Sequence, residues 1–234
     1  MPAQLPSNSP TNSPQFPARL WLIRHGQTDW NAQGRIQGQT STQLNAQGIA
    51  EAQTLAKVLA ATHRPFAVCY TSDLPRAAGT AEIIGAALAV PVLPDPGLRE
   101  RHFGAYEGRF AKDLRETRIA AGVNPHDLAD WTGMPDVESN DALWSRASAS
   151  LLQISARHPD QDILIVTHGG IIARAVYQTL AIPDTAPRRF PLSNGIVAIL
   201  QFSASHWNLI ALADLPFLSG LPLNQDTATT KTAD

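Results

Sequence analysis

Short apolar runs alternate with longer amphipathic segments along the chain, a pattern typical of a sheet covered by helices. Strands are predicted at residues 19–24, 66–71, 91–93, 163–167, 196–202 and 207–213. Helices are predicted at residues 46–61, 75–88, 110–120, 140–158 and 169–180. The last two strands, separated by a short polar stretch, are expected to form a hairpin. The alternation predicts an α/β fold, a three-layer sandwich in which helices flank a mostly parallel central sheet.

The segment 46–61 has a clear helical pattern. Asn45 precedes it and is a favoured N-cap residue. Its predicted apolar face consists of Ile49, Ala52, Leu55, Ala56 and Leu59. This face is expected to pack on the sheet.

Both ends of the chain differ in composition from its centre. Residues 1–18 are rich in proline and serine and are predicted to form a disordered arm. Residues 219–234 are rich in threonine, alanine and aspartate and are predicted to form a flexible tail. One folded domain is therefore expected over residues 19–218. Within it, residues 105–140 fit the alternation least well, and we expect a small helical cap insertion there.

Composition and charge narrow the function classes. The 234 residues are 44% hydrophobic and 16% charged, which suits an ordinary globular domain. The net charge of −2 gives no reason to expect nucleic-acid or membrane-surface binding. The single cysteine, Cys69, lies in an apolar run, so we expect a buried thiol and a cytoplasmic location. These features leave the oligomeric state open, with a homodimer as one candidate.

Charged residues follow strands or turns in four segments, 24–26, 72–76, 98–104 and 167–170. Because the carboxyl ends of parallel strands meet at one edge of a sheet, His25, Arg76 and His168 are expected to converge, with Glu100 within reach. An imidazole can attack phosphorus, arginine matches phosphate, and a carboxyl group can protonate the leaving oxygen. No Asp and His cluster has metal-ligand spacing, so neither a metal nor another cofactor is expected.

Each of these residues also has a structural interpretation. Taken alone, a histidine between Arg24 and Gly26 is more often structural, and His168 before two glycines suits a simple helix cap. Arg101 and its charged neighbours fit a solvated run as well as a binding site. Arg76 is different, because a cation in the first turn of a helix opposes the helix dipole. For Arg76 a phosphate clamp is therefore the preferred interpretation.

The segment Leu22–Asn31, with the sequence Leu-Ile-Arg-His-Gly-Gln-Thr-Asp-Trp-Asn, resembles the signature of the histidine phosphatase superfamily. This group includes the cofactor-dependent phosphoglycerate mutases. The resemblance continues, in the family's order, through the segments 37–38, 71–77, 98–100 and 166–170. It covers about residues 19–202 and is specific because several motifs occur together.

The resemblance implies a role for each matching residue. His25 would be the nucleophile that becomes phosphohistidine, Glu100 the general acid, and His168 a further catalytic residue. The phosphoryl group would be held by Arg24, Asn31, Arg76, His168 and Gly169. The remainder of the substrate, a small phosphorylated metabolite, would contact Gln37, Gly38 and Arg101.

The sequence also bears on the choice between mutase and phosphatase. Residues 100–104 are close to the mutase pattern. The mutases then carry a Leu-Asn-Lys segment and a paired Arg-Arg, but this chain has no such pair before Arg188-Arg189. Segments 105–108 and 137–139 are more similar to the phosphatase branch. We therefore expect a phosphomonoesterase of the histidine acid phosphatase type. A phosphoglycerate mutase, or an inactive relative that binds phosphorylated ligands, is the alternative.

Overall fold

The computed structural model describes residues 17–120, 122, 134–203 and 205–214. A six-stranded sheet with the order β3-β2-β4-β1-β5-β6 forms its centre. The strands are β1 (Arg19–Arg24), β2 (Phe66–Thr71), β3 (Val92–Pro94), β4 (Asp162–Thr167), β5 (Val197–Ser203) and β6 (His206–Ala213). The β1, β2, β3 and β4 strands pair in parallel, while β5 pairs antiparallel with both of its neighbours.

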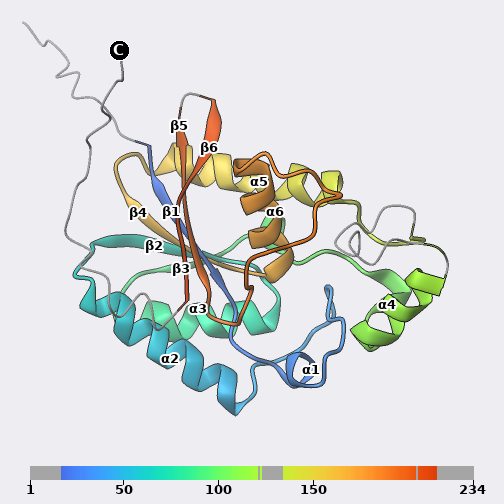
Figure 1. Cartoon of the computed structure of the whole chain (residues 1–234). Coiled ribbons are helices and arrows are strands. Elements are labelled where there is room, and N and C mark those ends of the chain that lie inside the picture. Colours follow the sequence, from blue (N-terminus) through green and yellow to red (C-terminus); the bar gives the residue numbers. More distant parts are fainter. Residues whose placement is uncertain (1–16, 121, 123–133, 204, 215–234) are drawn as a thin grey trace, which may run out of the picture.

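Helices cover both faces of this sheet (Figure 1). One layer contains α2 (Ala46–Ala61) and α3 (Pro75–Leu88), and the other contains α5 (Asn140–Arg157) and α6 (Gly169–Thr179). Shorter elements connect them: α1 (Asp29–Ala32), η1 (Pro96–Leu98), η2 (Gly104–Tyr106) and α4 (Ala111–Ala120). The predicted three-layer α/β sandwich is confirmed.

Alternation along the central strands separates two apolar cores. In β1, Trp21 and Ile23 pack with α2 and α3, whereas Leu20 and Leu22 pack with α5 and α6. Side chains of a strand point alternately to its two faces, so a strand covered on both sides is apolar throughout. The parallel pairing of β1 with β4 places Arg24 opposite Thr167 at the carboxyl ends of the two strands.

Most predicted elements agree with the structure to within two residues. One predicted packing residue is wrong: Ile49 is 41% exposed, and Gly48 occupies the buried position on α2 instead. A Cβ atom on Gly48 would lie 2.1 Å from the carbonyl oxygen of Gln27, so the helix approaches the loop after β1 through a residue without a side chain. Such a backbone contact cannot be predicted from the periodicity of apolar side chains, because glycine has no side chain.

Helix α4, which belongs to the segment predicted to form a cap, lies beyond the carboxyl edge of the sheet and stands apart from the sandwich (Figure 1). This segment is joined to the loop after α1 by an antiparallel bridge between Arg35 and Phe110. The predicted arm and tail fall almost entirely outside the described residues, as do residues 121 and 123–133 of the cap segment.

Candidate functional site

His25 lies directly after β1 and is 3% exposed. Its backbone N–H donates to the Thr167 carbonyl at the end of β4, and its own carbonyl accepts from Asn194 Nδ2 at 2.8 Å. The next residue, Gly26, donates its N–H to Thr80 Oγ1 of α3. Contacts from the end of β4, from the loop before β5 and from α3 therefore hold the backbone at His25 and Gly26 in place.

The partners of the His25 ring determine which nitrogen carries the proton. Nδ1 lies 2.7 Å from the Gly26 carbonyl oxygen, which only accepts, so Nδ1 is the protonated nitrogen. Nε2 accepts from Arg76 Nε at 3.2 Å and therefore carries the lone pair. Burial, followed by the charges of Arg76 and Arg24, holds the His25 pKa well below its usual value. The ring is therefore a neutral imidazole with its lone pair on Nε2.

Arg76, in the first turn of α3, is 1% exposed. Its guanidinium donates to the Gly38 carbonyl at 2.7 Å, to the Thr40 carbonyl at 3.1 Å and to Thr42 Oγ1 at 3.3 Å, besides His25. Burial lowers its pKa to about 10, so it remains a cation at neutral pH. The helix dipole disfavours a cation in the first turn of α3, and the hydrogen bonds to these carbonyls offset that cost for Arg76.

His168 is fully buried, and its ring centroid lies 5.1 Å from that of His25. It occupies the N-cap position of α6, but its side chain does not cap the helix. Its Nε2 lies 2.8 Å from Ser72 Oγ instead. Burial lowers the His168 pKa, and the charge of Arg76 adds to this effect. The simple helix-cap interpretation is therefore wrong.

Two buried nitrogens of this cluster, Arg24 Nε and His168 Nδ1, have no hydrogen-bond partner within the described residues. Arg24 is anchored through Nη1 to the Leu192 carbonyl. A Cβ atom on Gly169 would lie 3.4 Å from Arg24 Nε, so the amino end of α6 approaches this guanidinium closely. Buried donors without partners are rare, and an anion bound between them would satisfy both.

Glu100 joins the cluster from the loop after η1. Its Oε1 accepts from the Arg101 N–H at 2.8 Å, and its Oε2 accepts from the Gly170 N–H at 3.0 Å. A Cβ atom on Gly170 would lie 2.1 Å from Oε1. The side chain is thus fixed at the first turn of α6, next to the glycine that faces Arg24.

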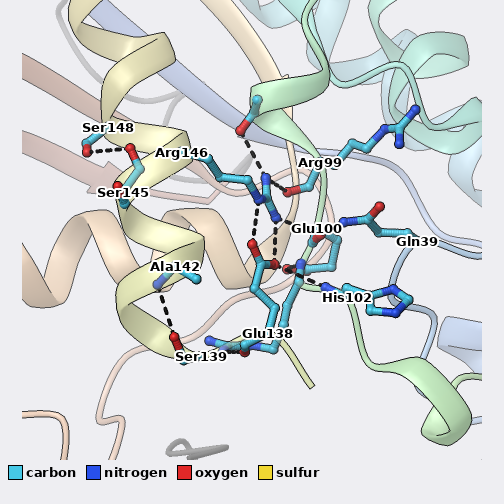
Figure 2. Close-up of polar contacts among 12 residues, drawn as sticks. Gln39, Arg99, Glu100, His102, Glu138, Ser139, Ala142, Ser145, Arg146 and Ser148 are labelled. Atoms are coloured by element: carbon cyan, nitrogen blue, oxygen red, sulfur yellow. Dashed lines mark hydrogen bonds and ion pairs between the residues drawn. The ribbon is translucent and has the colours of Figure 1, made fainter. Parts of the chain in front are cut away.

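The loop that carries Glu100 is held by Arg146 of α5, a residue not predicted from the sequence. Figure 2 shows the Arg146 guanidinium between the Glu138 carboxylate and the backbone of this loop. It donates to the carbonyls of Gly97, Arg99 and Glu100 at 3.0, 2.7 and 2.9 Å. It also contacts Glu138 through two hydrogen bonds, at 2.7 and 2.9 Å. Burial would raise the Glu138 pKa, but the bonds and charge of Arg146 lower it overall.

Several residues predicted to contact ligand have clear roles within the protein. Asn31 Oδ1 accepts from the Thr28 N–H, which completes a capping box at the start of α1. Gln37 Oε1 accepts from the hydroxyls of Thr28 and Thr42. Gly38, at φ +54°, presents its carbonyl to Arg76. Gln37 and Gly38 therefore position Arg76 and its surroundings.

Arg101 is 4% exposed and is not part of a solvated run. It donates to the Glu138 carbonyl at 2.5 Å and to Asn140 Oδ1 at 2.6 Å. Its neighbour Arg99 does lie nearer the surface, paired with Asp73. Arg101 thus lines the site while also joining the Glu100 loop to the start of α5.

A cavity of about 350 Å³ opens beside Glu100 and Arg24. Its wall is formed by Arg24, Glu100, Arg101, Phe103, Asn140, Gly169, Gly170, Ala173, Arg174, Tyr177, Asp184, Arg188 and Leu192. Four arginines face two carboxyl groups, which suits an anionic ligand of small size. His25, Arg76 and His168 are buried and are not part of this wall.

Other site classes have little support in the described part of the chain. No three His, Cys, Asp or Glu residues there are grouped as they would be around a metal ion. None of the helices described has the length and apolar character needed to cross a bilayer. Cys69 is buried as expected, and burial raises its thiol pKa to about 12, so it is unreactive.

Sequence reasoning missed Arg146, Arg174 and Arg188. Arg174 had a usable signal, because a charged residue interrupts the apolar run Ile171–Val176 of α6. The signal for Arg146 was weaker: a cation on a helix whose other face is apolar suggests only that the side chain lies away from the core. Arg188 stood out only as part of the Arg188-Arg189 pair, because the loop between α6 and β5 has no periodicity from which to place its side chains.

Known proteins resemble this chain over most of its length. Residues 20–215 match the histidine phosphatase superfamily (branch 1). A metal-independent phosphoserine phosphatase from Arabidopsis thaliana is 35% identical, covering 86% of this chain and 83% of the relative. A probable phosphoglycerate mutase from Proteus mirabilis is 33% identical over 81% of this chain and 87% of its own. The solved structure of a mycobacterial glucosyl-3-phosphoglycerate phosphatase has a TM-score of 0.72 and 30% identity, covering 84% of this chain and 98% of that one.

Proposed function

The chain belongs to the histidine phosphatase superfamily, and on that premise we propose that it hydrolyses a small phosphorylated metabolite through a phosphohistidine on His25. The observation that carries the proposal is the ring of His25, whose Nδ1 binds the Gly26 carbonyl and whose Nε2 faces Arg76. A neutral imidazole with a defined lone pair beside a buried cation suits attack on a phosphate ester.

In the first step, Nε2 of His25 gives up its hydrogen bond from Arg76 Nε and forms a bond to phosphorus while the bond from phosphorus to the ester oxygen breaks. The freed Arg76 Nε–H then donates to a phosphoryl oxygen. The phosphoryl oxygens are clamped by Arg76, by Arg24 Nε and by His168 Nδ1, with the Asn31 amide as a further donor. These groups offset negative charge in a buried site, where their effect is greater than in water. The two buried nitrogens without partners support this assignment.

Glu100 supplies the proton that the leaving oxygen needs. Its carboxyl group lies against the Gly170 N–H, on the cavity side of the cluster, where the organic part of the ester would leave. In the second step, Glu100 accepts a proton from water, whose oxygen attacks the phosphorus. The bond to Nε2 then breaks, which releases inorganic phosphate and restores neutral His25.

We assign the enzyme to the histidine acid phosphatase type. The lowered pKa of His25 keeps the nucleophile unprotonated as the solution becomes acidic, which supports activity below pH 6.5. A phosphoglycerate mutase is the second candidate, because some relatives carry that name. The mutase reaction would differ only in what accepts the phosphoryl group from His25: a second substrate molecule instead of water.

The test compares wild type with His25→Asn and with His63→Asn, a matched change at an exposed histidine. Wild type and His63→Asn are expected to hydrolyse p-nitrophenyl phosphate equally, and His25→Asn to lose on the order of 10³-fold or more. A phosphoenzyme trapped from labelled substrate should be labile to acid and absent in His25→Asn. Hydrolysis by His25→Asn at the wild-type rate would refute the nucleophile. Faster conversion of 3-phosphoglycerate into 2-phosphoglycerate than into free phosphate would favour the mutase.

A further inference from the structure

The cavity extends from the phosphate cluster to a second basic group on α6 and on the loop that follows it. Arg174 is 5% exposed, lines the cavity and has an Nε atom without a partner among the described residues. Its Nη1 donates to Asp184, whose other oxygen accepts from Asn140 Nδ2 at 3.0 Å. A buried guanidinium with an unused donor is costly unless a ligand meets it.

Arg188 stands at the exposed rim of the same cavity and forms no hydrogen bond or ion pair with any residue that the structure describes. Its loop is nevertheless held. The Tyr177 hydroxyl donates to the Ala186 carbonyl at 2.9 Å, and Arg24 donates to the Leu192 carbonyl. The arginine that would clamp the phosphoryl group therefore also anchors the loop that presents Arg188.

The positive charges around Arg174 and Arg188 outnumber the carboxylates that pair with them in this part of the cavity wall. Asp184 pairs with Arg174, and Arg101 donates to the Glu138 backbone carbonyl and to Asn140. Arg188 and Arg174 Nε have no partner among the described residues and remain available to a ligand. Two donors at one end of a 350 Å³ cavity suit a planar group such as a carboxylate, which arginine binds through paired hydrogen bonds. A phosphoryl group at the other end would occupy the remaining cations.

We propose that Arg188 and Arg174 bind a carboxylate on the substrate, so that α6 and the loop after it select carboxylate-bearing phosphomonoesters. This inference rests on the proposed function, because it assigns specificity to the same site. The two residues are specificity determinants and take no part in bond breaking.

The experiment compares two esters that differ in this group, 3-phosphoglycerate and glycerol 3-phosphate. Wild type should prefer 3-phosphoglycerate in kcat/KM by at least about tenfold. Arg188→Gln should reduce this preference roughly 10-fold to 100-fold, mainly through KM, because a hydrogen bond to a charged group is lost. Arg189→Gln, one residue along and absent from the cavity wall, is the matched control and should keep the preference.

Arg174→Gln should reduce the same preference, and its fold is checked by circular dichroism. Equal losses for both esters in Arg188→Gln, an unchanged preference, or no preference in wild type would each overturn the carboxylate site. In those cases hydrolysis of p-nitrophenyl phosphate would persist and leave the proposed function standing. Absence of hydrolysis for all three esters would instead overturn the proposed function, and this inference with it.

Discussion

Arg76 donates a hydrogen bond from Nε to Nε2 of His25 across 3.2 Å, joining the first turn of α3 to the end of β1. This bond directs the lone pair of His25 at the cation that would receive the phosphoryl charge. It also opposes protonation of His25, since a second positive charge would form beside the first. The same pair thus sets both the reactivity of the ring and its response to acid.

Acid should destabilise the fold through His25 and His168. Both have lowered pKa values in the folded protein, so the unfolded chain binds more protons below pH 6.5 and stability falls as pH falls. Each histidine contributes up to about 1.4 kcal/mol per pH unit in the range below 6.5. Urea unfolding of wild type and His168→Asn from pH 7.5 to 5 measures the slope, which should be shallower in the variant. Identical slopes would mean that His168 is not buried as a neutral ring.

Glu100→Gln should slow esters with poor leaving groups far more than activated ones. Without a proton donor, an alkyl phosphate should lose roughly 10²-fold to 10⁴-fold in kcat, while p-nitrophenyl phosphate should lose much less. Glu82→Gln, an exposed change on α3, serves as the control. Steady-state kinetics on both esters decides the point, and equal losses would count against Glu100 as the acid.

Arg146→Ala should weaken catalysis by displacing the Glu100 loop. It removes three donors to the carbonyls of that loop, and small misplacement of a catalytic group can cost up to about 10²-fold. Because Arg146 acts through Glu100, the loss on poor leaving groups should largely vanish in a Glu100→Gln background. A double-mutant cycle of kcat values measures this coupling. Additive losses would show that Arg146 has an independent effect.

Gly38→Ala and Gly34→Ala form a matched pair at positive φ. Both substitutions strain the backbone, at φ +54° and +70°, by about 1–2 kcal/mol. At Gly38 the new Cβ atom would also lie 2.0 Å from Glu107 Oε1, whereas at Gly34 nothing lies within 4 Å. Only Gly38→Ala should therefore displace the carbonyl that binds Arg76 and lower activity. Thermal unfolding and kcat are the measurements, and equal activity losses would contradict this role of Gly38.

The strands, the helices and the residues around the phosphate cluster could be predicted from the chain alone. Apolar runs and amphipathic periods are local properties, so they located β1, β4 and the helices that cover them. The parallel arrangement then implied that His25, Arg76 and His168 meet at one edge, and the structure brings them together. Local pattern and sheet topology were sufficient because the ends of the strands are aligned by their backbone hydrogen bonds.

Only the tertiary structure decided how these groups are held and what lies beside them. The protonated nitrogen of His25 depends on the Gly26 carbonyl and on Arg76, 51 residues away. The position of Glu100 depends on Arg146, and the basic end of the cavity depends on Arg174 and Arg188. Such contacts join segments that are far apart in the sequence, so no local pattern of residues predicts them. The sequence by itself determined phosphate chemistry and its sheet edge, while the fold determined the geometry of the nucleophile and the surroundings of the substrate.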